Sequence, residues 1–173
     1  MSDAARSLAR RPIDWSFVAF WVINFGFITY MVDLEQLVIR DPARFAYPIW
    51  PPRFAIDAIH WWSRSFDPVV WHRAPWYRAT VWIDALLFGP FYLFAIYAFV
   101  KGRSWIRLPA MVWAGMMIAN VTIILFEELA GPTPTPAPAI VVMANLPWLL
   151  VPFSVVWRLR KEDPFASVEP KPA

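Results

Sequence analysis

The sequence of 173 residues contains no cysteine and only two histidines. The absence of cysteine excludes disulfides and thiolate metal sites. It also means that the sequence does not indicate whether the protein lies in an oxidising or a reducing compartment. His60 and His72 have no metal-ligand spacing with other candidate ligands and are interpreted as interfacial. The sequence has no metal motif, nucleophile elbow or phosphate-binding glycine loop. It therefore predicts neither a bound metal nor another cofactor.

Charged residues are also scarce, at 17%, whereas hydrophobic residues make up 59% and the mean hydropathy is +0.44. A soluble fold of this size has too much surface to hide so large an apolar fraction, so the bilayer is the favoured solvent. The twelve tryptophans agree, since indole favours the membrane–water interface. The net charge of +3 is small, and basic residues cluster beside apolar runs. This pattern fits membrane topology rather than nucleic acid binding.

Four apolar segments reach the length of roughly 20 residues that a membrane helix needs. They are expected at residues 15–30 with an extension to 39, at 80–100, at 105–126, and from about 139 to 160. We therefore predict an all-α integral membrane protein, built as a bundle of four transmembrane helices. A cytoplasmic N-terminal segment (1–12) precedes the membrane domain (13–160), and a disordered cytoplasmic tail (161–173) follows it.

Basic residues predict the orientation of these spans. They flank the start of the first span, the loop between the second and third, and the end of the fourth, whereas EELAGPTPTPAPA between the third and fourth has none. The positive-inside rule then places both termini in the cytoplasm. The first loop, residues 40–78, does not fit, because it holds six arginines on the predicted outer side. The host membrane is predicted to be the endoplasmic reticulum in a eukaryote and the inner membrane in a bacterium.

The first loop is rich in aromatic residues and prolines. Its stretch RFAIDAIHWWSRSF, residues 53–66, can form a short amphipathic helix that lies in the interface. Two interpretations stay open. The helix is either a lid over a pocket or an interfacial anchor with no pocket beneath it.

Polar side chains inside the spans are the main functional signal. An ionisable group at the bilayer centre costs at least ~2.5 kcal/mol, so it rarely occurs without a partner or a task. With alternating span directions, five such residues fall in the outer half of the bundle: Asp33, Asp84, Asn120, Glu127 and Asn145. Polar groups from four helices at one depth predict a pocket.

Each of these residues also has a simpler interpretation. Asp33 can reach the interface together with Glu35, and Glu128 is interpreted as solvated at the water boundary. Asn120 and Asn145 can hydrogen-bond between helices without binding any ligand, an interaction worth about 0.6 kcal/mol on average.

Prolines in two spans predict kinked helices. Pro147 and Pro152 cannot donate the helical hydrogen bond, and Gly89–Pro90 is expected to disturb the second span in the same way. Irregular backbone at membrane depth is tolerated where it lines a cavity. Kinked helices that face each other open a space, and Trp148 would offer this space a large aromatic face.

Several stretches occur in the order of a known family: MVDLEQL, FDP at 66–68, GPF at 89–91, IYAFVKGRSWIRLPA at 96–110, LFEEL, and NLPWLLVPF at 145–153. From about residue 29 to 160 the chain resembles the EXPERA-domain superfamily, which includes the sigma-two receptor branch and the emopamil-binding, sterol Δ8–Δ7 isomerase branch. The stretch at 96–110 looks closest to the sigma-two branch. The resemblance implies a hydrophobic pocket for sterol-like, isoprenoid-like or cationic amphiphilic ligands. Members of this family can dimerise, so a homodimer stays open.

The resemblance also implies roles for single residues. Asp33 matches the first-helix acid that faces the pocket, and Asp84 matches an acidic position on the second helix. Asn145 and Trp148 look like the asparagine and tryptophan of the isomerase site. Thr29 stands where the isomerase has a histidine.

These inferences define two predicted sets. Structural roles are assigned to Asp67, which matches a lid aspartate of the family, and to Glu127, Pro90 and Pro147. The predicted ligand-binding residues are Thr29, Asp33, Asp84, Asn120, Asn145 and Trp148.

Three functions stay open for this site. In the first, the pocket binds a lipid: two carboxylates in a low-dielectric pocket repel, so one stays protonated near neutral pH while the other pairs with a cationic amine. In the second, an isomerase or cyclase uses Asp33 and Asp84 as catalytic acid and base, and Trp148 stabilises a carbocation. Thr29 in place of histidine weakens this alternative. In the third, the polar residues only join the helices of an assembly partner.

Overall fold

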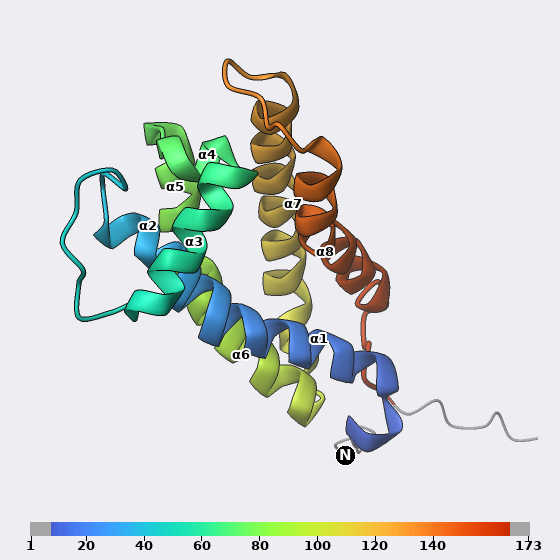
Figure 1. Cartoon of the computed structure of the whole chain (residues 1–173). Coiled ribbons are helices and arrows are strands. Elements are labelled where there is room, and N and C mark those ends of the chain that lie inside the picture. Colours follow the sequence, from blue (N-terminus) through green and yellow to red (C-terminus); the bar gives the residue numbers. More distant parts are fainter. Residues whose placement is uncertain (1–7, 167–173) are drawn as a thin grey trace, which may run out of the picture.

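A computed structural model describes residues 8–166, and all its long elements are helices (Figure 1). Four helical stretches are long and apolar enough to cross a membrane: Pro12–Val38, Pro75–Lys101, Ser104–Ala130 and Pro138–Arg158. The predicted fold class and the four predicted spans are confirmed. The main difference is that the second span starts five residues earlier than residue 80, because Pro75 provides a favourable first helical residue.

The first span changes helical type along its length. It begins as α1 (Pro12–Ile23), passes through η2 (Asn24–Asp33), which has the wider π-helical turn, and ends as α2 (Leu34–Val38). π-Helical turns are rare and frequently occur at functional sites. The segment η2 is therefore where a site is expected on this helix.

The second span has the same design. It consists of α5 (Pro75–Ile83), the π-helical η3 (Asp84–Phe88) and α6 (Gly89–Lys101). The irregularity predicted at Gly89–Pro90 thus lies directly after η3. Gly89 packs closely on Tyr30 of η2, and a Cβ atom at this position would lie 2.5 Å from the Tyr30 hydroxyl oxygen. The two π-helical segments consequently pack side by side.

The third and fourth spans form a long antiparallel pair (Figure 1). The third comprises a short 3-10 turn, η4 (Ser104–Ile106), and α7 (Arg107–Ala130), and the fourth is α8 (Pro138–Arg158). Pro147 and Pro152 lie inside α8, which stays helical past both.

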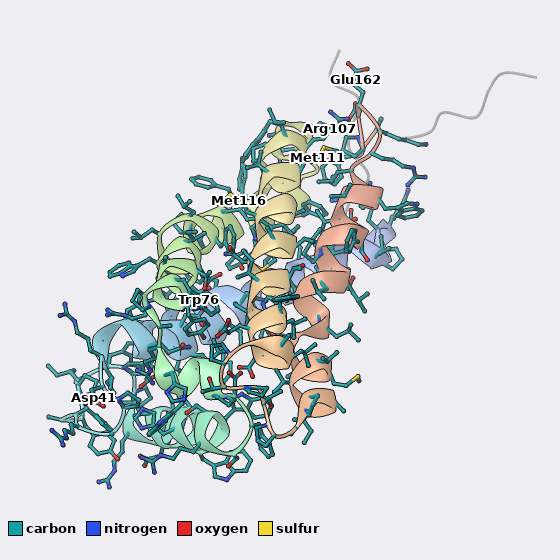
Figure 2. The ribbon with its side chains drawn as sticks, turned by 90° about the horizontal axis from the view of Figure 1, so that it is seen from above. Asp41, Trp76, Arg107, Met111, Met116 and Glu162 are labelled. Atoms are coloured by element: carbon teal, nitrogen blue, oxygen red, sulfur yellow. The ribbon has the colours of Figure 1, made fainter. Side chains whose placement is uncertain are left out.

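The first loop folds as a lid. Its helix α3 (Arg53–Ser65) buries Ala55, Ile56 and Ile59 and packs on η2, while α4 (Pro68–His72) packs on α7. The amphipathic helix expected at residues 53–66 is thus present. A short 3-10 turn, η1 (Leu8–Arg10), precedes α1 at the other end of the molecule. In Figure 2 the loop that carries Asp41 and the C-terminal segment that carries Glu162 lie at opposite ends.

An aromatic core and an ion-pair cluster hold the bundle together near its termini. Trp21 and Phe99 pack edge-to-face with ring centroids 4.7 Å apart. Asp14 has no exposed surface, and it accepts hydrogen bonds from Arg11 and from Arg158 of α8. These contacts join the first and fourth spans at this end.

The segment predicted to be a disordered tail starts at Lys161, and the structure describes its first six residues. Phe165 is buried there against Phe99, and the guanidinium groups of Arg11 and Arg158 lie over its ring. The first part of the predicted tail thus packs on the bundle through one aromatic side chain, and the disorder of the tail stays a prediction. Residues 1–7 and 167–173 lie outside the described residues.

Candidate functional site

A cavity of about 500 Å³ lies between the four spans and below the lid. Side chains of η2, α3, the second span, α7 and α8 all line it. Five of the six predicted ligand-binding residues are among them: Asp33, Asp84, Asn120, Asn145 and Trp148. The lid interpretation of the first loop therefore holds, because α3 contributes to the wall of a real cavity.

Two carboxyl groups meet at one wall of this cavity. Asp33 is the last residue of η2, and Asp84 is the first residue of η3, so the packing of the two π-helical segments brings them together. Both carboxyl groups line the cavity, close enough to interact electrostatically. Two neighbouring buried carboxylates repel each other, so we expect the pair to hold one proton and carry a single negative charge.

Asp84 is also fixed by two hydroxyl donors. The Thr29 hydroxyl donates to Oδ2, and the Tyr92 hydroxyl lies 3.3 Å from Oδ1. Thr29 does not line the cavity, and its buried side chain contacts Asp84 instead. Tyr92 was not predicted, since a tyrosine in an aromatic-rich span gives no distinctive signal.

Asp33 has a second polar neighbour that the sequence analysis did not identify. The side-chain amide nitrogen of Gln36 lies 3.5 Å from Oδ1 of Asp33. The amide oxygen of Gln36 is buried and has no hydrogen-bond partner within residues 8–166. Gln36 also lines the cavity, so this pairing could have been found from its position one helical turn after Asp33.

The opposite wall is built by α7 and α8. The Trp148 indole nitrogen donates to the Asn24 side-chain oxygen at 2.7 Å, and the Asn24 amide donates back to the carbonyl of Phe20. Asn24 was not predicted either, although an asparagine within an apolar span was a visible signal. Asn145 donates to the carbonyl of Val141 in its own helix, which leaves its amide oxygen for the cavity.

Asp67 caps the lid. Its carboxylate accepts hydrogen bonds from the backbone N–H of Val70 at 3.0 Å and from the Trp62 indole at 3.3 Å. The Glu128 carboxyl group lies near that of Asp67, and its Oε1 accepts a hydrogen bond from the Val69 backbone N–H at 3.1 Å. Glu128 has no exposed surface. The interpretation of Glu128 as a solvated residue is thus wrong, because the start of α4 covers it.

The remaining predicted structural residues lie away from the cavity. Glu127 is half-buried beside Gly131 at the end of α7. Pro90 and Pro147 are exposed on their helices. Their structural roles stay predictions.

A buried charge cluster next to the site was also missed. Glu35 has no exposed surface and lies 2.8 Å from a guanidinium nitrogen of Arg73 and 2.8 Å from the imidazole Nε2 of His60. Arg73 also donates to the carbonyl of Ile39. Neither the interfacial interpretation of His60 nor that of Glu35 is correct, whereas His72 is exposed. The three charged residues are far apart in the sequence, so no local pattern revealed the cluster.

The described part of the chain, residues 8–166, contains no group of three or more His, Cys, Asp or Glu side chains arranged to hold a metal ion. What the arrangement offers is an apolar, aromatic-lined space with the acid pair, a third carboxylate from Asp67, and three amides from Gln36, Asn120 and Asn145. It can bury a hydrophobic ligand and bind a hydroxyl or an amine at the acids.

Four helices of membrane-spanning length surround a cavity that polar side chains partly line. This architecture defines an integral membrane protein with a cavity between its spans. The family model of EXPERA (EXPanded EBP superfamily) matches residues 54–159, and the chain belongs to this family. The resemblance seen in the sequence is therefore confirmed.

The relatives point to one branch of the family. The chain is 30% identical over 130 residues to sigma intracellular receptor 2 of Xenopus tropicalis, an alignment that covers 74% of this chain and 71% of the relative. It is 25% identical over 177 residues to sigma intracellular receptor 2 of Homo sapiens, with 94% of each chain covered.

Proposed function

We propose that the chain binds a sterol-like or isoprenoid-like lipid, and cationic amphiphiles, in the cavity between its four spans. The observation that carries the proposal is that Asp33 and Asp84, brought together by the packing of η2 on η3, lie at one wall of a largely apolar cavity. A charge in a membrane costs free energy unless it has a partner or a function.

The acid pair matches the polar end of an amphiphile. With one proton between them, the two acids can donate a hydrogen bond to a ligand hydroxyl or accept one from an ammonium group. Aromatic side chains from several elements, among them Phe27, Trp62, Tyr77 and Trp148, line the space that the apolar body would fill. The volume of about 500 Å³ falls within the range of roughly 300–1,000 Å³ for sites of small organic ligands.

Binding of two probes to the purified protein tests this proposal. We expect Asp84→Asn to weaken the binding of an aliphatic tertiary amine by about 10-fold or more, since it removes a charge-assisted hydrogen bond. Cholesterol, which needs no negative charge, should lose less. Glu162→Gln, which changes an exposed acid at the opposite end of the molecule, is the matched control (Figure 2). Unchanged amine binding by Asp84→Asn would refute the acidic pocket.

The alternative is an isomerase or cyclase that uses the same residues. One observation favours it: Trp148 is held in place by Asn24 and lines the same cavity as the acid pair. An acid, a base and an aromatic cation stabiliser would then surround one substrate.

Incubation with a lipid extract in heavy water separates the two functions. Deuterium fixed on carbon of one bound sterol or terpenoid, and lost in Asp84→Asn, would establish proton transfer. A retained lipid that carries no deuterium would establish a binding protein. Purified protein that carries no lipid at all would instead favour the third function, in which polar residues only join the helices of an assembly partner.

Both termini are proposed to face the cytoplasm, in the endoplasmic reticulum of a eukaryote or the inner membrane of a bacterium. The charge distribution that supports this orientation comes from Arg10, Arg11, Arg107 and Arg158, which all lie at the end of the bundle away from the lid.

A further inference from the structure

The lid has a second cavity, on its outer side, with a volume of about 380 Å³. Helix α3 forms one wall, and the preceding loop forms the other through Phe45 and Tyr47. Trp61 of α3 lines both this cavity and the one between the spans. The two cavities thus share one side chain as a wall, but they differ in chemistry.

One half of the outer cavity suits a cation. The rings of Phe45 and Tyr47 pack edge-to-face at 5.0 Å, and the Tyr47 hydroxyl donates to Asp57 at 2.6 Å. This hydrogen bond raises the pKa of the Tyr47 phenol, so the ring stays neutral. The guanidinium of Arg53 lies 4.7 Å from the Tyr47 ring centre and 3.7 Å from Asp57 Oδ2, so this place already holds one cation. Because the Arg53 side chain is exposed, a ligand ammonium can displace it. Aromatic faces beside a carboxylate are the usual environment of a bound quaternary or primary ammonium.

The other half suits an anion. Arg64 lines the cavity and lies over the ring of Trp71 at 4.4 Å, and within residues 8–166 no carboxylate forms an ion pair with it. Ser65 follows it and adds a hydroxyl to the same wall. A guanidinium stacked on an aromatic ring keeps its N–H groups free at the edge, and these bind phosphate oxygens well.

The outer cavity also lies at the level of lipid headgroups. The lid connects the end of the first span at Val38 with the start of the second at Pro75. Its exposed side chains include Trp61, at 62%, and Phe54, at 70%, next to arginines. Tryptophan and arginine together are typical of the membrane–water interface.

We propose that the outer face of the lid binds the headgroup of a phospholipid that carries both a phosphate and an ammonium, as phosphatidylcholine and phosphatidylethanolamine do. The phosphate binds at Arg64 and Ser65, and the ammonium binds between Tyr47, Trp61 and Asp57. This site gives a role to Arg64, which lies in the first loop, where the arginines do not fit the positive-inside rule. It does not depend on what the inner cavity binds.

Native mass spectrometry of the purified full-length chain tests the proposal, with phosphatidylcholine, phosphatidylglycerol and diacylglycerol as separate probes. We expect one phosphatidylcholine to bind, and Arg64→Gln to weaken this binding by about 10-fold, because a charged hydrogen bond is lost. Arg160→Gln is the matched control, since Arg160 lies over Trp157 in the same way but at the other end of the bundle. It should bind phosphatidylcholine like the wild type.

Three further measurements make the result decisive. Equal binding of diacylglycerol, or unchanged binding by Arg64→Gln, would overturn the phosphate half of the site. Equal binding of phosphatidylglycerol would overturn the ammonium half, and Asp57→Asn should remove the preference for phosphatidylcholine if that half is correct.

Soluble glycerophosphocholine should compete only if the headgroup alone is recognised, and failure to compete would assign the affinity to the acyl chains instead. Asp84→Asn should leave this site intact, which separates it from the inner cavity.

Discussion

Glu35 is a carboxylate buried in the part of the molecule where a charge is most costly, and two groups from other elements compensate it. Arg73 approaches from the end of α4, and His60 approaches from α3, so both groups belong to the lid. Arg73 has a left-handed backbone conformation, with φ 50°, and donates to the carbonyls of Ile39 and Val70. The cluster thus fixes the lid to the end of the first span, two residues after Asp33.

We expect Glu35→Gln to lower the free energy of unfolding by about 3–5 kcal/mol, because Arg73 is then buried without its counter-charge. Thermal unfolding in detergent measures this. The double variant Glu35→Gln/Arg73→Met should recover much of the loss, since no uncompensated charge remains. The exposed pair of Arg53 and Asp57 is the control, and Asp57→Asn should change stability little.

Single residues were predictable where they interrupted an apolar run, and not where their partner was distant. Asp33 and Asp84 stood out because an acid in a membrane span is costly. Their direct contact depends on two helices packing in one register, which no sequence spacing encodes. Glu128 looked solvated because it lies near the end of its span, and only the position of α4 explains its burial.

At the scale of secondary structure elements, the two π-helical segments determine the site. Each of them carries one acid of the pair, and the contact between Gly89 and Tyr30 keeps the two segments close. The Tyr30 hydroxyl also donates to the carbonyl of Ala85 at 3.1 Å, which occupies one backbone acceptor within η3.

Gly89→Ala should therefore reduce stability by about 1–3 kcal/mol, because its methyl group overlaps the Tyr30 ring. It should also weaken amine binding, since η2 and η3 must separate. Gly115→Ala is the matched control: a Cβ atom there meets nothing within 4 Å, so stability should stay equal or rise slightly. Thermal unfolding and amine binding of both variants check this. Equal values for the two variants would contradict the close packing.

The positions of the elements were largely predictable from hydropathy and proline, and their helical type was not. Pro75 and Pro138 both stand at the first turn of a span, as the helix-start rule expects. A π-helical turn in η2 is different. It contains no proline, and its stability depends on packing against η3.

At the scale of the whole molecule, the spans are joined at one end and surround a cavity toward the other. The four-helix architecture followed directly from composition, because few other folds accommodate so apolar a chain. The orientation is predicted from the distribution of charge, whereas the homodimer is predicted from the family resemblance.

The natural absence of cysteine allows a direct test of orientation. We expect two single cysteines, one at Lys101 at the exposed end of α6 and one at Thr133 in the loop between α7 and α8, to differ in their reaction with a membrane-impermeant maleimide on intact bacterial cells that express the chain. Thr133→Cys should react, and Lys101→Cys should react only after the membrane is opened. The reverse pattern would show that the termini face the other side.

The ion pair between Asp14 and Arg158 has a consequence for biogenesis. Asp14 enters the membrane with the first helix, whereas Arg158 is made 144 residues later. Until then Asp14 has Arg11 beside it but lacks the fourth helix that completes its hydrogen bonds. A nascent chain that stops before Arg158 therefore keeps the ion pair of Arg11 and Asp14, but its first helix has no link to the fourth at this end until synthesis is nearly complete.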